Sequence, residues 1–244
     1  MKYPLLSVIT VTYNCETLIE PTIASVRTQK YDDIEHIIVD GMSTDDTVDI
    51  VKSNINDISA FISEEDQGIY DAMNKGIGMV SNHSKYICFM NAGDTFFDEN
   101  VVRDMIERSR SNTSHLYGRV SKAGRITSIP RKLNKYMLST NMVCHQAIFF
   151  QTEVHRTNLY DTRFRICADY KLLLQLVTSG EEFEAIDRIV AVVDDTGISN
   201  TERNRLRAEK ERIRASYPDV YWIAKIRLAA KRIRAKINKP ERKY

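Results

Sequence analysis

Tyr86-Ile-Cys-Phe-Met-Asn-Ala-Gly-Asp94 is the segment that says most about the fold of this chain. Five residues suited to a buried parallel strand lead directly into a short polar turn that ends in a carboxylate. Open α/β sheets bind ligands just beyond the carboxyl ends of their strands, so Asp94 stands where such a protein holds a ligand. A lone carboxylate can hold a divalent cation there if a phosphorylated ligand supplies the other oxygens. The alternative is a helix cap, because a helix-like segment follows Asp98.

The first hundred residues alternate between strand-like and helix-like patterns, which predicts parallel strands joined by helices. The expected strands are 5–11, 36–39, 59–63 and 86–90. The expected helices have inner faces made by Leu18, Thr22, Ile23 and Val26, then by Val48 and Val51 after a cap at Thr44 or Asp45, then by Tyr70, Met73, Ile77 and Val80.

The second half of the chain has a looser pattern. A hairpin is expected from 116–129, a strand at 145–150, a helix at 169–178 that ends at Gly180, and a strand at 186–193. No repeat or low-complexity linker interrupts the sequence. We therefore predict one α/β domain over residues 1–200, in halves 1–100 and 101–200, followed by a helical tail over 201–244.

The composition is that of an ordinary soluble protein, with 43% hydrophobic and 28% charged residues in 244. No segment approaches the roughly 18 apolar residues of a membrane span, and the amino terminus lacks a signal-peptide pattern, so a cytoplasmic location is expected. The four cysteines have no paired spacing. Buried reduced thiols are therefore expected in preference to disulfides or zinc ligands.

The net charge of +2 conceals an uneven distribution along the chain. Residues 202–244 contain 15 Lys and Arg against 5 Asp and Glu, whereas residues 1–201 contain 20 against 28. An acidic body can use carboxylates for chemistry or for a metal, and a basic tail can meet an anionic partner.

The tail has the pattern of a basic amphipathic helix that lies on an anionic membrane surface. The alternative is a helix packed on the rest of the chain with its charges in water. Nucleic acid is not an expected partner, because no recognition motif accompanies the charge. The apolar stripe is Ile223, Ile226, Ala230, Ile233 and Ile237, and the expected membrane contacts are Trp222, Lys225, Arg227, Lys231, Arg232 and Arg234.

Polar residues follow all four strands expected in the first half. They converge if the sheet is parallel, because the carboxyl ends of its strands share one edge. Asp40 suits a hydrogen bond to a base or ribose, although Asp before Gly is also a common turn residue. Tyr13 suits stacking on a base, although such an aromatic is also a common core residue. These strand ends are Tyr13-Asn14, Asp40-Gly41, Asp66-Gln67 and Asn91 to Asp94.

Phosphate-binding glycine loops are missing from the sequence. Neither Gly-x-Gly-x-x-Gly nor Gly-Lys-Ser/Thr occurs, which argues against a dinucleotide enzyme and against a P-loop ATPase. A cation or basic side chains must then neutralise any bound phosphates. Lys75, in the helix expected over residues 69–80, is a candidate for this role, and a solvated lysine is the alternative.

Five segments of the chain resemble the family 2 glycosyltransferases, in order and at family-like spacing over about residues 5–200. The first reads Leu6-Ser-Val-Ile-Thr-Val-Thr-Tyr-Asn14, and the resemblance is greatest to the bacterial exopolysaccharide, O-antigen and colanic-acid branch. The other four segments are Ile37 to Thr47, Ser63 to Ile77, His145 to Phe149 and Ala168 to Tyr170.

The resemblance implies a GT-A fold and transfer of a sugar, with inversion, from a nucleotide-diphosphate donor. It implies a nucleotide-sugar-binding half, an acceptor half, and a polyprenyl-diphosphate-linked saccharide as acceptor at the inner face of the cytoplasmic membrane. The implied roles are donor binding for Tyr13, Asp40, Asp66 and Asn91, a Mn²⁺ or Mg²⁺ ligand for Asp94, and the catalytic base for Asp169. Lys75 stays a donor-binding candidate from the residues alone, and His145 and Gln146 are expected on the acceptor or phosphate side.

The chain departs from the family pattern at two places. Asn91 stands where many members have the first Asp of an Asp-x-Asp motif, and Ala168 precedes Asp169 where Glu is common. On the residues alone, Asp169 can be a helix cap and His145 a structural residue. A nucleotidyltransferase is a competing function, but it needs a basic, Gly-rich phosphate loop near the amino terminus. An inactive nucleotide-binding module at the membrane surface is the non-enzymatic alternative.

Overall fold

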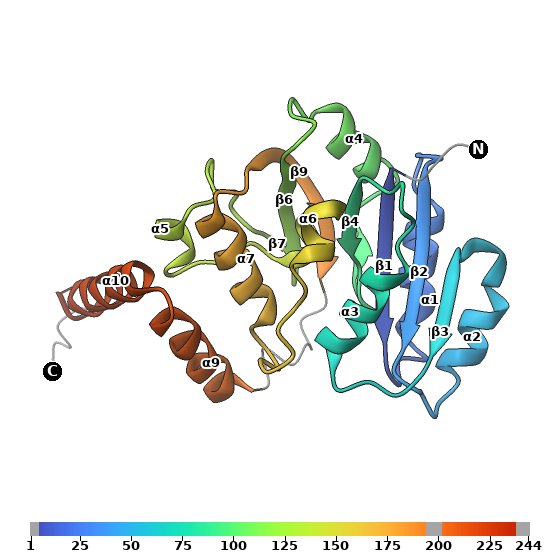
Figure 1. Ribbon diagram of the computed structural model, residues 1–244, viewed down its shortest axis with the longest axis horizontal. Helices are drawn as coiled ribbons and strands as arrows, with labels where there is room; N and C mark the ends of the chain where they lie inside the picture. Colours follow the sequence, from blue (N-terminus) through green and yellow to red (C-terminus); the bar gives the residue numbers. More distant parts are fainter. Residues whose placement is uncertain (1–4, 194–201, 238–244) are drawn as a thin grey trace, which may run out of the picture.

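A computed structural model describes residues 5–193 and 202–237, with side chains described as far as Lys231. Its centre is a nine-stranded sheet with strand order β3-β2-β1-β4-β8-β6-β9-β5, and β7 pairs with β6. Helices cover both faces of the sheet, and the two last helices extend away from it (Figure 1). The α/β class predicted from the sequence is confirmed.

The first half of the chain forms the parallel part of the sheet. In β1 and its neighbours, Ile9 pairs with Ile37 on one side and with Phe89 on the other. β1, β4 and the last five residues of β2 are buried on both faces, which explains their nearly continuous apolar sequences. The strands are β1 (Leu6–Thr12), β2 (Ile34–Asp40), β3 (Ala60–Ser63) and β4 (Tyr86–Phe89), and the helices between them are α1 (Ile19–Arg27), α2 (Thr47–Ser53), η1 (Ile55–Asp57) and α3 (Ile69–Met79).

The second half adds antiparallel and mixed pairings to the same sheet. β8 runs antiparallel to β4 and β6, while β6 and β9 are parallel. The strands are β5 (Thr95–Phe96), β6 (His115–Lys122), β7 (Arg125–Ile126), β8 (Ile148–Gln151) and β9 (Phe183–Val193), and the helices are α4 (Val101–Glu107), α5 (Lys135–Leu138), η2 (His145–Ala147), α6 (Thr152–Thr157) and α7 (Ala168–Ser179).

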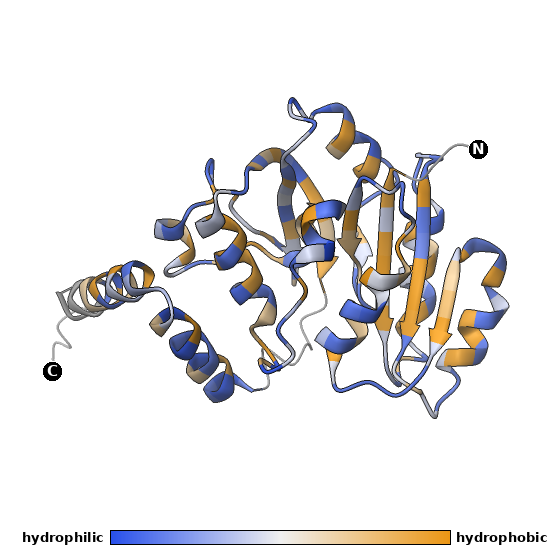
Figure 2. Ribbon diagram, in the orientation of Figure 1, coloured by the Kyte–Doolittle hydropathy of each residue, from blue (hydrophilic) through white to orange (hydrophobic). Residues whose placement is uncertain are grey.

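Alternate residues of the strands face opposite sides of the sheet, where the buried residues form three clusters, the smallest of them around Ile38 of β2. Ile9 and Ile37 face α3 and α7, whereas Val8 and Cys88 face the opposite core with α4. Gly76 lets α3 approach the sheet, because a Cβ there would lie 2.5 Å from Ile9 Cγ2. Figure 2 shows the apolar strands between more polar outer helix surfaces.

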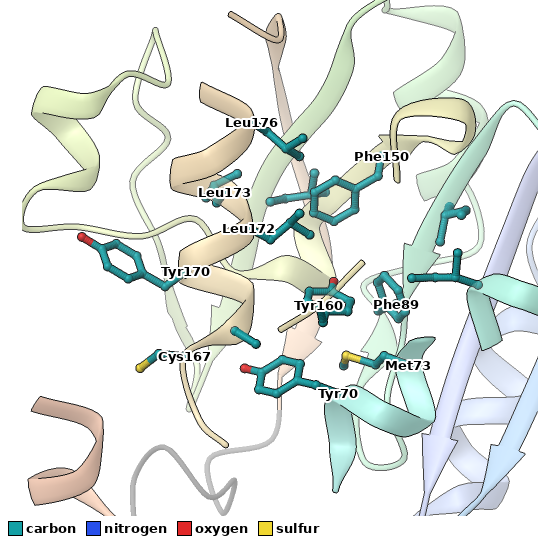
Figure 3. Close-up of a cluster of buried hydrophobic side chains, with 14 of the residues drawn as sticks. Tyr70, Met73, Phe89, Phe150, Tyr160, Cys167, Tyr170, Leu172, Leu173 and Leu176 are labelled. Carbon is teal, nitrogen blue, oxygen red and sulfur yellow. The ribbon is translucent and has the colours of Figure 1, made fainter. Parts of the chain in front are cut away.

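Aromatic rings fill the core between α3, β4 and α7. The Tyr160 ring lies 5.2 Å from the Tyr70 ring and 5.5 Å from the Phe89 ring, measured between centroids. Figure 3 shows this group, with leucines of α7 packed beside it. The packing fixes α7 against the parallel half of the sheet, which matters because the segment 168–170 begins this helix.

Several predicted boundaries are wrong in detail. The strand expected at 145–150 begins as the 3-10 turn η2, and the second hairpin strand has only the residues of β7. The N-cap of α2 is Asp46, and its buried positions are Thr47 and Val51. The helix after Asp98 is capped at Asn100. Asp94 is therefore not a helix cap, and β5 follows it directly.

The four cysteines are free thiols, as expected. Cys88 and Cys167 are buried, whereas Cys15 and Cys144 are half-buried, so burial was correctly expected for only two. Burial raises the pKa of Cys144 and of Cys167 to about 12, which keeps these thiols protonated.

The basic tail forms α9 (Arg203–Ala215) and α10 (Pro218–Ile237). Val220 and Ala224 face the rest of the protein, while Trp222 and Ile226 are 64% and 67% exposed. The start of α10 is thus packed, and an apolar pair remains on its outer side. Ile233, Ile237, Arg232 and Arg234 lie outside the described side chains. Within residues 5–193 and 202–237, no helix is both long and apolar enough to cross a membrane.

We expect the buried histidines to make the protein less stable on mild acidification. Burial lowers the pKa of His36 and of His155 to about 4, and that of His115 to about 3. Below pH 6.5 the unfolded chain therefore binds protons that the folded protein does not bind. The free energy of unfolding is highest above that pH and decreases as the pH falls. The expected loss is about 1.4 kcal/mol per pH unit for each histidine.

We expect His155→Phe to reduce this pH dependence, because His155 packs against the rings of Phe89, Phe150 and Tyr160 and a phenyl ring takes up no proton. Urea unfolding at pH 7 and pH 5 measures the effect. The interpretation fails if the variant loses as much unfolding free energy between these two pH values as the original protein does.

Candidate active site

The loops that follow β1 and β2 hold each other in place at the carboxyl edge of the sheet. Asn14 donates its backbone N–H to Ser43 Oγ at 2.8 Å, and its Oδ1 accepts from Thr44 N at 2.8 Å. Asn14 and Met42 adopt left-handed backbone angles, with φ of 50° and 66°. Such angles are uncommon outside glycine, and Asn tolerates them best. The predicted convergence of strand ends therefore holds for this pair of loops.

Tyr13, Gly41 and Asp66 form a corner at this edge. Tyr13 is 59% exposed, so its ring is accessible to a planar ligand. A Cβ on Gly41 would lie 2.4 Å from Asp66 Oδ2 and 3.4 Å from Tyr13 Cδ2, which shows how closely the three residues approach. The other oxygen of Asp66 accepts from Gly68 N at 2.7 Å. The corner has an aromatic face and a carboxylate, which suit a base and a ribose.

Asp40 is fully buried beneath this corner. Its carboxylate accepts hydrogen bonds from Ser43 N at 2.9 Å, from Ser43 Oγ, and from Ser63 Oγ at 2.6 Å. Asp40 thus joins the loop after β2 to the end of β3. These serines are partners that the sequence pattern did not reveal.

Lys75 lies at the same edge but is held by protein acceptors. Its Nζ is 2.9 Å from Glu64 Oε1, 2.6 Å from Glu65 O and 3.8 Å from Asp71 Oδ2. A phosphate that binds Lys75 has to compete with Glu64 for this ammonium group.

Asp94 is a buried carboxylate anchored from two directions. Gln146 Nε2 donates to Asp94 Oδ2 at 2.7 Å, and Thr22 Oγ1 of α1 donates to the Asp94 carbonyl at 2.8 Å. Gly93, with φ of 98°, makes the sharp turn before it. Gln146, predicted for the acceptor or phosphate side, is therefore a partner of the predicted metal ligand.

The turn from Asn91 to Asp94 offers two oxygen ligands of the kind that Mg²⁺ and Mn²⁺ accept. Asn91 Oδ1 is buried and has no hydrogen-bond partner among the described residues, and Asp94 supplies a carboxylate. The described residues contain no cluster of three or more His, Cys, Asp or Glu that could hold a metal. A cation would therefore have to take its remaining oxygens from a ligand or from water, as Mg²⁺ commonly does.

His145 connects this turn to Asp169. Asn91 Nδ2 lies 3.3 Å from His145 Nε2, and His145 Nδ1 lies 3.2 Å from Asp169 Oδ2. An amide NH₂ only donates, so Nε2 accepts and the ring proton resides on Nδ1, facing the carboxylate; this tautomer is inferred from the network. Asn91 thus favours the tautomer of His145 with its proton on Nδ1, whereas an Asp at this position would accept a hydrogen bond from Nε2.

Asp169 lies in the first turn of α7, but it is not the cap. The N-cap is Cys167, which makes no side-chain capping bond. Asp169 Oδ1 accepts from Tyr70 OH at 3.0 Å and from Tyr170 N at 2.7 Å. The carboxylate also benefits from the positive end of the helix dipole. Tyr70 was predicted only as a core residue, and the sequence pattern did not reveal its hydroxyl, which lies within hydrogen-bond distance of both Asp169 Oδ1 and Ile166 O (2.8 Å).

Glu209 of α9 is a second residue that the sequence did not reveal. Its buried carboxylate accepts from three successive backbone N–H groups, at Arg165 (3.1 Å), Ile166 (2.9 Å) and Cys167 (3.0 Å). These groups lie immediately before α7. A helix of the basic tail therefore fixes the loop that leads to Asp169.

The residues from 7 to 169 match the family model described as Glycosyl transferase family 2. This chain belongs to that family. The glycosyltransferase is 33% identical to an uncharacterized glycosyltransferase of Mycobacterium tuberculosis over 206 residues, which cover 81% of this chain and 78% of that protein. It is also 28% identical to a PGL/p-HBAD biosynthesis glycosyltransferase of Mycobacterium bovis, covering 70% of this chain and 68% of that one.

Solved structures show that the fold is GT-A. Staphylococcus aureus TarS, residues 1–349, in complex with UDP-GlcNAc matches with a TM-score of 0.68 and 16% identity, covering 89% of this chain and 72% of that one. The mannosyltransferase PcManGT of Pyrobaculum calidifontis, in complex with GDP-Man and Mn²⁺, matches with a TM-score of 0.64 and 18% identity, covering 93% and 75%. The predicted fold is confirmed.

The Glu209 clamp predicts that Glu209→Gln destabilises the glycosyltransferase by about 1–3 kcal/mol, because a charged acceptor of buried N–H groups is replaced by an amide with a single oxygen acceptor. Glu211→Gln is the matched control on the same helix, since Glu211 is exposed and its one ion pair among the described side chains is with Lys225. Urea unfolding compares the two variants. Equal stabilities of the two would contradict the clamp.

Proposed function

We propose that this glycosyltransferase moves a sugar from a nucleotide-diphosphate donor to an acceptor hydroxyl with inversion, and that Asp169 is the catalytic base. The observation that carries the proposal is the chain of contacts from Asn91 through His145 to Asp169. It sets an oriented carboxylate beside the turn that has oxygen ligands for a cation. A base and a diphosphate site side by side are what such a transfer needs.

The corner of Tyr13, Gly41 and Asp66 supports binding of the donor's nucleoside. The Tyr13 ring can stack on the base, and Asp66 can accept hydrogen bonds from the ribose. TarS and PcManGT, which share the fold, have been solved with UDP-GlcNAc and with GDP-Man. Asp40 was expected to hydrogen-bond the base or ribose, but its fully buried carboxylate accepts from Ser43 and Ser63, so in this proposal it holds the loop that carries Gly41.

Asp94 and Asn91 Oδ1 are the ligands we assign to a divalent cation, Mn²⁺ or Mg²⁺. When bound, the cation supplies positive charge to the departing diphosphate. Gln146 donates to Asp94, and His145 accepts from Asn91, so each ligand is fixed by a hydrogen bond with the turn η2.

Asp169 takes the proton of the acceptor hydroxyl during attack. Tyr70 OH and Tyr170 N occupy Oδ1, so Oδ2, which also accepts from His145 Nδ1, has a lone pair for the incoming proton. The acceptor oxygen forms the new bond to the anomeric carbon as the bond from that carbon to the diphosphate oxygen breaks. Attack from the face opposite the diphosphate inverts the anomeric configuration.

We further propose a polyprenyl-diphosphate-linked saccharide as acceptor, a hexose or deoxyhexose as the transferred sugar, and a role in bacterial surface polysaccharide synthesis at the inner face of the cytoplasmic membrane. The exposed Trp222 and Ile226 on α10 support contact with a membrane surface. Two of the predicted membrane contacts have protein partners, because Lys225 pairs with Glu211 and Arg227 donates to the carbonyl of Tyr136. The exopolysaccharide and O-antigen branch stays a prediction.

Asp169→Asn is expected to lower transfer by a factor of about 100 to 10,000, because the amide cannot take up the proton. Nucleoside diphosphate binding is expected to persist. Release of nucleoside diphosphate from a panel of nucleotide sugars measures transfer, and calorimetry measures binding. Asp49→Asn, at an exposed site on α2, is the control. Undiminished transfer, or lost nucleotide binding, in the Asp169 variant contradicts the base assignment.

A further inference from the structure

A cavity of about 700 Å³ lies between α9 and α10, and the roles proposed so far leave it unused. One wall is the face of α9 that carries Arg207, Lys210 and Arg214 at helical spacing. The opposite wall is α10, with Tyr221 and Leu228. The cleft thus has a basic side and a side with apolar and aromatic surface.

Within the described side chains, the one carboxylate that lines the cleft, Glu211, does not neutralise the whole basic wall. Lys225 and Glu211 form an ion pair at 2.6 Å across the cleft, so their two charges cancel. Among residues whose side chains the structure describes, Arg207 and Lys210 form no ion pair with a carboxylate. Arg214 donates to Tyr170 OH at 3.1 Å, a neutral partner. The excess positive charge favours an anionic ligand.

The other wall restricts which anion fits. Ala224, Leu228 and Ala229 of α10 line the cavity beside the cations, and Tyr221 adds an aromatic ring. Inorganic phosphate makes no use of such a surface. A phosphate or diphosphate ester of an apolar alcohol uses both walls, because the charged group meets α9 while the hydrocarbon removes apolar area of α10 from water.

The cleft lies against the first turn of α7, the helix that carries Asp169. Lys210 Nζ lies 5.5 Å from the centroid of the Tyr170 ring, and Tyr170 directly follows Asp169 in the chain. Glu209, between the cleft residues of α9 in sequence, clamps the loop before α7. The helix that supplies the cations therefore also fixes the segment that carries the base.

We propose that this α9–α10 cleft binds the lipid phosphate or diphosphate of the acceptor, with Arg207, Lys210 and Arg214 as its ligands and the α10 wall as a seat for the first part of the hydrocarbon chain. The proposal rests on the proposed transfer function. It assigns the basic tail to recognition of the acceptor, in addition to any contact with the bilayer.

Calorimetry on the full chain tests the cleft with farnesyl diphosphate as the probe. We expect farnesyl diphosphate to bind more tightly than pyrophosphate and farnesol. The double variant Arg207→Gln, Lys210→Gln should weaken this binding by about tenfold or more, because two cationic contacts are lost. Arg203→Gln, at an exposed position of α9 outside the cleft, should leave it unchanged.

Binding of UDP, GDP and dTDP with Mn²⁺ is measured in parallel, so that the two proposals can fail separately. Nucleotide binding without farnesyl diphosphate binding overturns the cleft assignment alone. Equal affinity of the double variant and the original protein for farnesyl diphosphate also overturns it. The assignment is also overturned if the double variant no longer binds phosphatidylglycerol vesicles but keeps its affinity for farnesyl diphosphate, because the charges would then serve the bilayer.

Discussion

His145 joins the two halves of the sheet at the point where the chemistry is proposed to occur. Its ring lies between Asn91, which follows β4 in the parallel half, and Asp169, which begins α7 in the second half. Gln146, the next residue, holds Asp94. One short turn, η2, therefore sets the position of the base and of the cation ligands relative to each other. A small shift of this turn would separate groups that must act on the same sugar.

The neighbouring elements explain why η2 and α7 stay in place. Phe89 packs its ring edge to face with His145, at 6.4 Å between centroids, and Tyr70 reaches Asp169 from the core. Glu209 closes the loop before α7 from the opposite side. Each contact is a hydrogen bond or ring contact to a group that is at least half-buried, where such interactions are strongest and costly to lose.

The sequence predicted the strands and helices that a local pattern of apolar residues encodes. β1 to β4 and α3 follow from the apolar periodicity, and the approach of Tyr13 and Asp66 at Gly41 follows from the parallel order of the strands. The contacts that orient the site were not predictable, because they join residues far apart in the chain. Tyr70 and Asp169 are separated by 99 residues and Glu209 and Ile166 by 43. Neither spacing leaves a periodic signal, and Glu209 looks like any charged residue of a solvated helix.

The central claim is that the edge with Asn91 and Asp94 binds a nucleoside diphosphate through a divalent cation. Thermal unfolding in the presence of UDP, GDP or dTDP, with and without Mn²⁺, tests it most directly, because a ligand that binds only the folded state raises the melting temperature. We expect stabilisation by at least one of these nucleotides that requires the metal and is lost in Asp94→Asn. No stabilisation by any of them, or the same stabilisation in Asp94→Asn, would contradict it.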